Sequence, residues 1–276
     1  MAISAQDVNK LRQMTGAGMM DCKKALQEAN GDFDEAITIL RKQGQKVSEK
    51  RADREANEGV VFAYTAPDAT EGVVIALKCE TDFVAKNEEF VALGNNILNT
   101  AVAQKPANIE ALLDLAIDGL AIREHLIAMV GKIGEKIEVG AYEYAKADTV
   151  VTYIHYGAKL GVLLSLNGAK GEAVVEAGKD VCLQIAAMNP IAIDKDGVDA
   201  DTIAREIEIG KDQARQEGKP EAIIEKIAMG KLEKFYKERT LLHQEFVKDS
   251  SMTIAQMLKK VDANLSITNF KRVSVA

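Results

Sequence analysis

The strongest constraint on the fold is a pattern that occurs twice: two β-rich runs, one segment with helical periodicity and one proline. The first copy consists of 60–64, 72–77, about 87–104 and Pro106, and the second of 150–154, 161–166, about 171–188 and Pro190. Two β-rich runs joined by turn residues indicate a hairpin, and apolar residues three to four apart indicate an amphipathic helix. The repeat therefore predicts two related α+β subdomains, each an antiparallel hairpin with a helix on one face.

The segments on either side of this repeat have a helical character. Three short helices are predicted within the first forty residues, beginning with a capping pattern at Ser4 and Asp7. The basic, polar stretch 41–57 is predicted to be a partly helical linker, since it lacks an apolar stripe. Two charged helical stretches around Gly218 predict an antiparallel helical hairpin.

The end of the chain is predicted to return to the core. A helix is expected at about 253–261, and 267–273 alternates like an edge strand of a subdomain sheet. The fold class is thus α+β, with four predicted units: a helical domain and linker, 1–54; an N-terminal core subdomain, 55–142; a C-terminal core subdomain with a terminal module, 143–197 and 240–276; and the inserted hairpin, 198–239.

Composition limits the classes of function. The 276 residues are 47% hydrophobic and 28% charged, as in ordinary globular proteins. The formal charge of −7 argues against direct binding of nucleic acid, which requires a basic field. The sequence has no signal-peptide core and no apolar run long enough to cross a bilayer, so a cytoplasmic protein without membrane contact is predicted.

Motifs for catalysis or cofactor binding are absent from the sequence. It contains no phosphate-binding G-x-x-x-x-G-K-[ST] loop, and its three histidines are too far apart in sequence to suggest a zinc site. Cys22, Cys79 and Cys182 are isolated within apolar or helical patterns, which predicts buried, reduced thiols. We therefore predict a protein that is not an enzyme and that uses neither a cofactor nor a metal.

Five stretches carry a resemblance to a known family. They are VNKLRQMTGAGMMDCKKALQEANGDFDEAI (8–37), CETDFVAKNEEF (79–90), KIGEKIEV (132–139), HYGAKLGVLL (155–164) and QIAAMNP (184–190). In order and spacing they resemble the bacterial elongation factor Ts family. The resemblance implies an N-terminal bundle like a ubiquitin-associated domain, a core of two similar subdomains, a coiled-coil hairpin and a C-terminal module. It also implies guanine-nucleotide exchange on the translation GTPase elongation factor Tu.

The main candidate site is the stretch Thr81, Asp82, Phe83 and Val84. Taken alone, an aromatic residue between a strand and a helix is more often part of the core. The resemblance implies instead that this stretch approaches the magnesium site of GDP-bound elongation factor Tu and dislodges the ion. Phe83 would be the wedge and Asp82 an adjacent polar contact, while Thr81 and Val84 would shape the loop.

The resemblance implies further partner contacts at Ile133, Gly134 and His155. Each has a structural alternative: a loop glycine beside a buried isoleucine, and a histidine satisfied at a strand end. On the second N-terminal helix, spacing suggests that Met19 packs inward while Met20 and Lys23 face the partner. The helical hairpin either forms a homodimer or touches the partner, and its charged surface does not distinguish these roles.

A rival hypothesis is a passive adaptor or chaperone-like module. Such a protein would hold a protein partner through the N-terminal bundle and the hairpin without changing nucleotide affinity. It would also be acidic and would also lack catalytic motifs. The stretch 81–84 favours the exchange factor, because a passive adaptor has no need of it. A thiol-dependent enzyme, a third idea, would have to lose its activity on substitution of Cys79→Ser.

Overall fold

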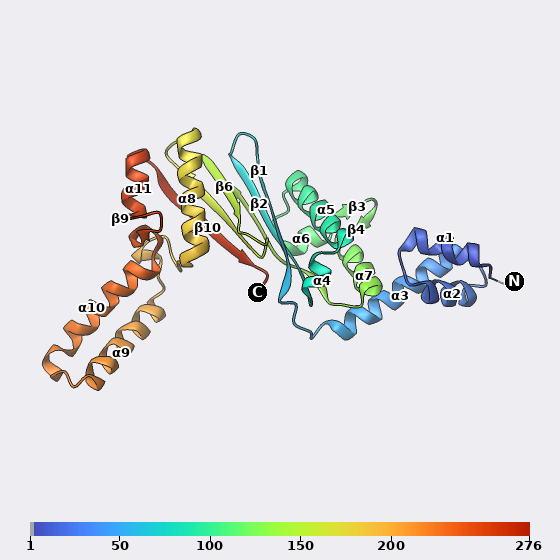
Figure 1. Cartoon of the computed structure of the whole chain (residues 1–276), viewed down its shortest axis with the longest axis horizontal. Coiled ribbons are helices and arrows are strands. Elements are labelled where there is room, and N and C mark those ends of the chain that lie inside the picture. Colours follow the sequence, from blue (N-terminus) through green and yellow to red (C-terminus); the bar gives the residue numbers. More distant parts are fainter. Residues whose placement is uncertain (1–2) are drawn as a thin grey trace.

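The computed structural model describes residues 3–276 and shows an elongated molecule with the N-terminal helices at one end and a helical hairpin at the other (Figure 1). The first three helices are α1 (Ala5–Thr15), α2 (Met19–Glu28) and α3 (Phe33–Arg51). Ser4 caps α1 through the predicted capping box with Asp7. The three helices enclose a small core centred on Leu11, Cys22 and Leu26.

Helix α3 is longer than predicted, because it continues through the expected linker as far as Arg51. Its second half packs on α7 (Ile122–Ile133) rather than on the N-terminal bundle. The two backbones meet at Gly44 and Gly131, where a Cβ added to Gly131 would lie 2.8 Å from the Gly44 Cα. Glycine has no side chain, so a helix contact made through glycines adds nothing to the periodic pattern of apolar residues. The sequence therefore could not indicate this packing.

The first subdomain is built on an antiparallel sheet of β1 (Glu58–Thr65), β2 (Glu71–Cys79) and β5 (Ile137–Lys146), in the order β1-β2-β5. Between β2 and β5 lie α4 (Asp82–Ala85), α5 (Glu88–Gln104), α6 (Ile109–Leu113), a small ribbon of β3 (Ala116–Ile117) and β4 (Leu120–Ala121), and α7. The predicted hairpin and helix are present, and β5 is an additional strand. Phe90 and Ile97 of α5 are fully buried on one face of the sheet.

The second subdomain repeats this plan with β6 (Thr149–Ile154), β7 (Leu160–Asn167) and β10 (Ser266–Ser274), in the order β10-β7-β6. Helix α8 (Glu172–Met188) covers one face. The chain then passes through η1 (Lys195–Gly197), the hairpin, η2 (Leu241–His243), β8 (Glu245–Phe246), β9 (Asp249–Thr253) and α11 (Ile254–Val261). Strand β10 forms the predicted edge, antiparallel to β7.

The two sheets pack face to face through their small residues. Along β2, Val73, Ile75 and Leu77 join the core under the helices, whereas Val74 and Ala76 face the other sheet. Gly72 of β2 and Gly161 of β7 allow the close approach. A Cβ on Gly72 would lie 2.7 Å from Val150 Cγ1, and one on Gly161 would lie 2.6 Å from Val61 Cγ1.

Two hydrogen bonds between the subdomains are related by the internal repeat. Val61 N–H donates to the carbonyl of Ala158 at 2.7 Å, and Val150 N–H donates to the carbonyl of Ala69 at 2.6 Å. The pairs Val61/Val150 and Ala69/Ala158 are each separated by 89 positions. Each hairpin therefore places its turn on the first strand of the other subdomain, at the equivalent position.

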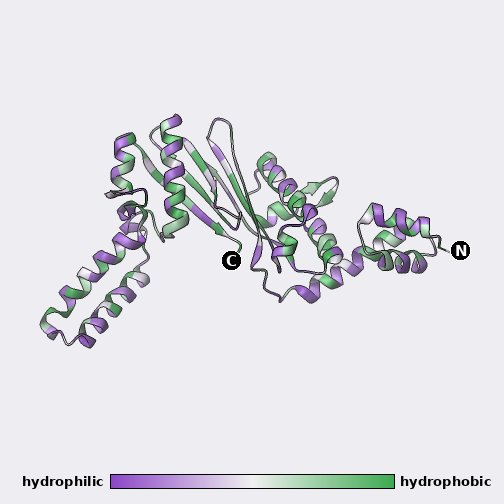
Figure 2. Ribbon diagram, in the orientation of Figure 1, coloured by the Kyte–Doolittle hydropathy of each residue, from purple (hydrophilic) through white to green (hydrophobic). Residues whose placement is uncertain are grey.

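The inserted hairpin consists of α9 (Ala200–Gln216) and α10 (Glu221–Arg239) and projects from the second subdomain (Figure 1). Hydropathy colouring shows many apolar residues in the sheets and their covering helices, and a mixture of hydrophilic and apolar residues along the hairpin (Figure 2). The predicted α+β fold class is confirmed. Across residues 3–276, no helix combines the length and apolarity needed to span a membrane.

Candidate functional site

The segment after β2 presents an aromatic side chain to solvent. Thr81 is the N-cap of α4, and its hydroxyl accepts a hydrogen bond from Val84 N–H at 3.4 Å. Val84 and Ala85 are buried in the first core, whereas Phe83 is 82% exposed. Phe83 therefore lies on a short helical turn that is fixed to the core by the two residues that follow it. A large apolar side chain is seldom so exposed.

Two loops are joined beneath this helical turn. The carboxylate of Glu135 accepts hydrogen bonds from the backbone N–H of Thr81 at 3.0 Å and from its hydroxyl at 2.8 Å. The carboxylate of Glu80 accepts from the backbone N–H of Lys136 at 2.7 Å and from the guanidinium of Arg51 at 2.9 Å. Burial would raise the pKa of Glu80, but these two donors outweigh it and hold the pKa below its usual range.

The structure brings Ile133 and Gly134 to the same place, because they immediately precede Glu135. Gly134 ends α7 in a left-handed conformation with φ +81°, and no atom lies within 4 Å of the position that a Cβ would take. Its partly exposed backbone, without a side chain, allows another chain to approach closely. Ile133 is partly buried against the first core, as the structural alternative expected.

Asp82 is already engaged within the protein. The Lys86 ammonium lies 2.7 Å from Asp82 Oδ2 and holds the pKa of this carboxyl below its ordinary value, with a smaller contribution from Lys159. Both groups are exposed, so an isolated pair of this kind adds little to stability. Asp82 is ionised at neutral pH and available at the surface beside Phe83.

The turn between β6 and β7 carries His155 and lies near α4. It is fixed to β1 by the hydrogen bond from Val61 to Ala158, and Lys159 donates to Glu58 at the start of β1 at 2.9 Å. His155 Nδ1 lies 3.1 Å from the hydroxyl of Tyr153. The neighbouring Tyr156 is 98% exposed, and sequence reasoning missed it. The available signal was a large aromatic residue directly before a turn glycine, Gly157.

Met20 and Lys23 lie on α2, in the N-terminal bundle at one end of the molecule, whereas α4 lies on the central core (Figure 1). Both side chains are exposed, and Met20 is 62% accessible. The expectation that Met19 packs inward is wrong, since Met19 is 54% exposed. It is the first residue of α2, and the bundle core closes only at Cys22, one turn later.

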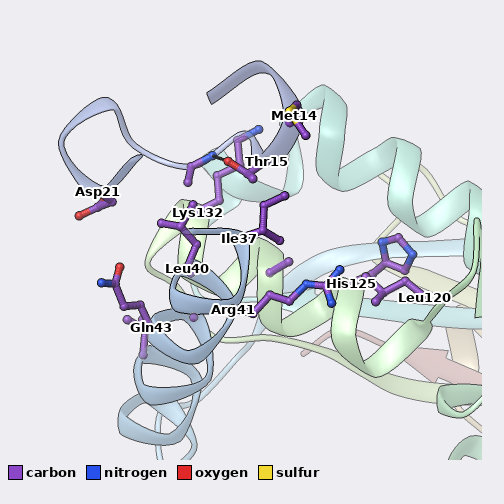
Figure 3. A pocket seen from close by; sticks show the side chains of 15 residues that line it. Met14, Thr15, Asp21, Ile37, Leu40, Arg41, Gln43, Leu120, His125 and Lys132 are labelled. Atoms are coloured by element: carbon purple, nitrogen blue, oxygen red, sulfur yellow. Dashed lines mark hydrogen bonds between the residues drawn. The ribbon is translucent and has the colours of Figure 1, made fainter. Parts of the chain in front are cut away.

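A cavity of about 450 Å³ separates the N-terminal bundle from α7 (Figure 3). Apolar side chains including Ile37 and Leu40 line it, with Arg41, His125 and Lys132 among the polar residues. His125 Nε2 is already 2.9 Å from the carbonyl of Ile117. Nowhere in the part of the chain that the structure describes do three or more His, Cys, Asp or Glu side chains gather as a potential metal site.

The cysteines are poorly suited to nucleophilic chemistry. All three are buried and free of disulfides, as predicted. Burial, assisted by the negative charge of Glu135, raises the pKa of Cys79 to about 12, and burial also raises the pKa of Cys182. Because the thiolate is the reactive form, both side chains are inert thiols at neutral pH.

Comparison with known proteins finds one family along most of the chain. The model of the family described as Elongation factor TS matches residues 80–276. Three similar proteins are each called "Elongation factor Ts". The one from Amoebophilus asiaticus is 58% identical, covering 100% of this chain and 99% of that protein. The one from Cytophaga hutchinsonii is 53% identical, covering 99% of each. The one from Porphyromonas gingivalis is 49% identical, covering 100% and 99%.

Proposed function

This chain belongs to the elongation factor Ts family of translation elongation factors, and from that premise we propose that it is a guanine-nucleotide exchange factor for elongation factor Tu. It would bind the GDP-bound GTPase, promote release of GDP and hold the nucleotide-free form until GTP binds. The same membership makes the cytoplasm the proposed location. We also propose 1–54, 55–142, 143–197 with 240–276, and 198–239 as the structural units.

The observation that supports this function best is the exposure of Phe83 on an anchored turn. A phenyl ring that is 82% exposed in the free protein can enter an apolar gap of a partner without first leaving a core. The proposed target is the edge of the nucleotide site, where Mg²⁺ is among the largest local charges holding the phosphates. Displacing the groups around the ion would weaken retention of GDP.

Exchange needs no covalent step in this mechanism. The factor binds the nucleotide-free GTPase more tightly than the GDP-bound form, so by linkage GDP binds the complexed GTPase more weakly by the same factor. Excess GTP then rebinds and displaces the factor. The residues involved bind and insert, and none has to transfer a proton or form a bond.

Two neighbouring groups would extend the contact around Phe83. Gly134 would offer partly exposed backbone, and Ile133 a partly buried apolar side chain, next to the loop joined to Thr81. His155 and Tyr156 lie on the turn that is fixed to β1. Met20 and Lys23 would form a separate contact from the N-terminal bundle. Homodimer formation through the hairpin stays a sequence-based prediction, and the adaptor hypothesis is the alternative function.

The deciding experiment is stopped-flow release of a fluorescent GDP analogue from elongation factor Tu in excess unlabelled nucleotide. Substoichiometric amounts of this protein should accelerate release strongly, because each molecule acts repeatedly. The same protein should form a complex with elongation factor Tu that added GDP dissociates. Binding without any acceleration of release would contradict exchange activity and favour the adaptor.

A further inference from the structure

Two carboxylates join the loops on either side of the exposed aromatic turn in a reciprocal way. Glu135 accepts from the backbone N–H of Thr81 at 3.0 Å, and Glu80 accepts from the backbone N–H of Lys136 at 2.7 Å. Each carboxylate thus precedes the residue whose N–H binds the other carboxylate. We call these four residues, Glu80, Thr81, Glu135 and Lys136, the carboxylate latch.

Glu135 differs from Glu80 in its surroundings. Glu80 is paired with Arg51 at 2.9 Å, whereas no Lys, Arg or His nitrogen of residues 3–276 lies within 4 Å of the Glu135 carboxylate. Its two oxygens instead accept from the N–H and the hydroxyl of Thr81. Hydrogen bonds to an ionised carboxylate are stronger than those between neutral groups. The principal role that this geometry allows Glu135 is therefore to hold Thr81.

Thr81 in turn determines the direction of α4. A helix of four residues is not stable by itself, so its orientation depends on its cap and on packing. Val84 and Ala85 supply the packing, and Thr81 supplies the cap. Since Phe83 is on the opposite, exposed side of the turn, any loosening of Thr81 would allow the ring to move.

We propose that Glu135 is a positioning residue for exchange, which fixes Thr81 and thereby holds the helical turn that carries Phe83 in one orientation before the partner arrives. The proposal rests on the proposed function of Phe83 as the residue inserted into elongation factor Tu. A backbone turn ordered in advance loses less conformational entropy on binding, so the latch would increase the fraction of productive encounters. Glu135 itself would not need to touch the partner.

The positioning can be tested without the partner. The chain contains no tryptophan, so Phe83→Trp introduces a single fluorescent reporter at the exposed site. Time-resolved anisotropy of this variant should show overall tumbling and the fast rotation of an exposed side chain, without a further component from motion of the turn. Adding Glu135→Ala should produce a further component of large amplitude from motion of the turn, and Glu135→Gln a smaller one, because its amide oxygen can still accept one hydrogen bond. Asp118→Asn is the matched control, since it removes an exposed charge from the turn between β3 and β4, at a left-handed position that Asn tolerates.

The functional test is a double-mutant cycle on GDP release from elongation factor Tu. Glu135→Ala should slow factor-stimulated release about tenfold, as expected for a lost charge-assisted hydrogen bond. In a Phe83→Ala background the same substitution should have little further effect, because the two residues act through one contact. Thermal unfolding of each variant would verify the fold.

Two results would overturn the proposal: unchanged anisotropy at position 83 in folded Glu135→Ala, or an equal slowing of release with and without Phe83. If the unsubstituted protein failed to stimulate release at all, the proposed exchange function would fail. The anisotropy measurement would still decide whether Glu135 positions residue 83.

Discussion

Replacing Phe83 by alanine should slow nucleotide exchange while changing the free energy of unfolding little. Phe90→Ala is the matched control, because it truncates the same kind of side chain in the core. An aromatic side chain presents about 200 Å², so a residue that is 82% exposed buries only about 40 Å², worth about 1 kcal/mol at most. Phe90 is fully buried, and its truncation should lower the free energy of unfolding by about 3–5 kcal/mol. Urea denaturation of the two variants would measure this difference directly.

The effect on exchange follows from the remaining surface of Phe83. If elongation factor Tu covers the exposed area of about 160 Å², the gain is at most about 4 kcal/mol, within the usual range of interface hot spots. A loss of about 2–4 kcal/mol corresponds to slowing of stimulated GDP release by about 30-fold to about 900-fold in the stopped-flow assay. If folded Phe83→Ala stimulated GDP release as fast as the unsubstituted protein, Phe83 would not be the inserted residue. If it were destabilised as much as Phe90→Ala, Phe83 would not be exposed.

Two further predictions concern the core. Gly161→Ala should lower the free energy of unfolding by about 1–3 kcal/mol in urea denaturation, because its Cβ would lie 2.6 Å from Val61 Cγ1. Gly230→Ala is the control and should not destabilise the protein, because the space around Gly230 is open. The raised pKa of Cys79 means that the folded state keeps its thiol proton longer than the unfolded state. The free energy of unfolding should therefore fall as pH rises from about 9 to about 12, and Cys79→Ala should reduce that fall; an equal fall in both proteins would contradict the assignment.

Most of the regular elements could be predicted from apolar periodicity, but strand β5 could not. The pairing of β5 with β2 shifts register between Ala76 and Leu77, which are opposite Ala141 and Val139. The extra residue, Gly140, interrupts the alternation of Ile137 and Val139 with the residues that follow. A strand with a bulge in its middle no longer has the two-residue period by which strands are recognised.

The site shows a different limit. The bonds between Glu135 and Thr81 join residues 54 positions apart, and no local pattern indicates a contact of that range. Tyr156 was missed because periodicity describes strands and says nothing about which turn residue faces solvent. For Phe83, local pattern favoured burial, while the family resemblance implied a surface role. The exposure results from the packing of Val84 and Ala85, a tertiary property.

The internal repeat explains how two proposed contact regions, α4 and the turn between β6 and β7, can have a fixed geometry. Each hairpin turn is bonded to the first strand of the other subdomain, through Ala69 in one case and Ala158 in the other. The second of these turns carries Tyr156, and the strand that receives it, β1, also packs against α4. The symmetric packing of the sheets thus sets the separation of Phe83 and Tyr156, while the residues in the turns differ between the two copies. Binding residues can therefore vary on one side of the repeat without changing the sheet contacts that position them.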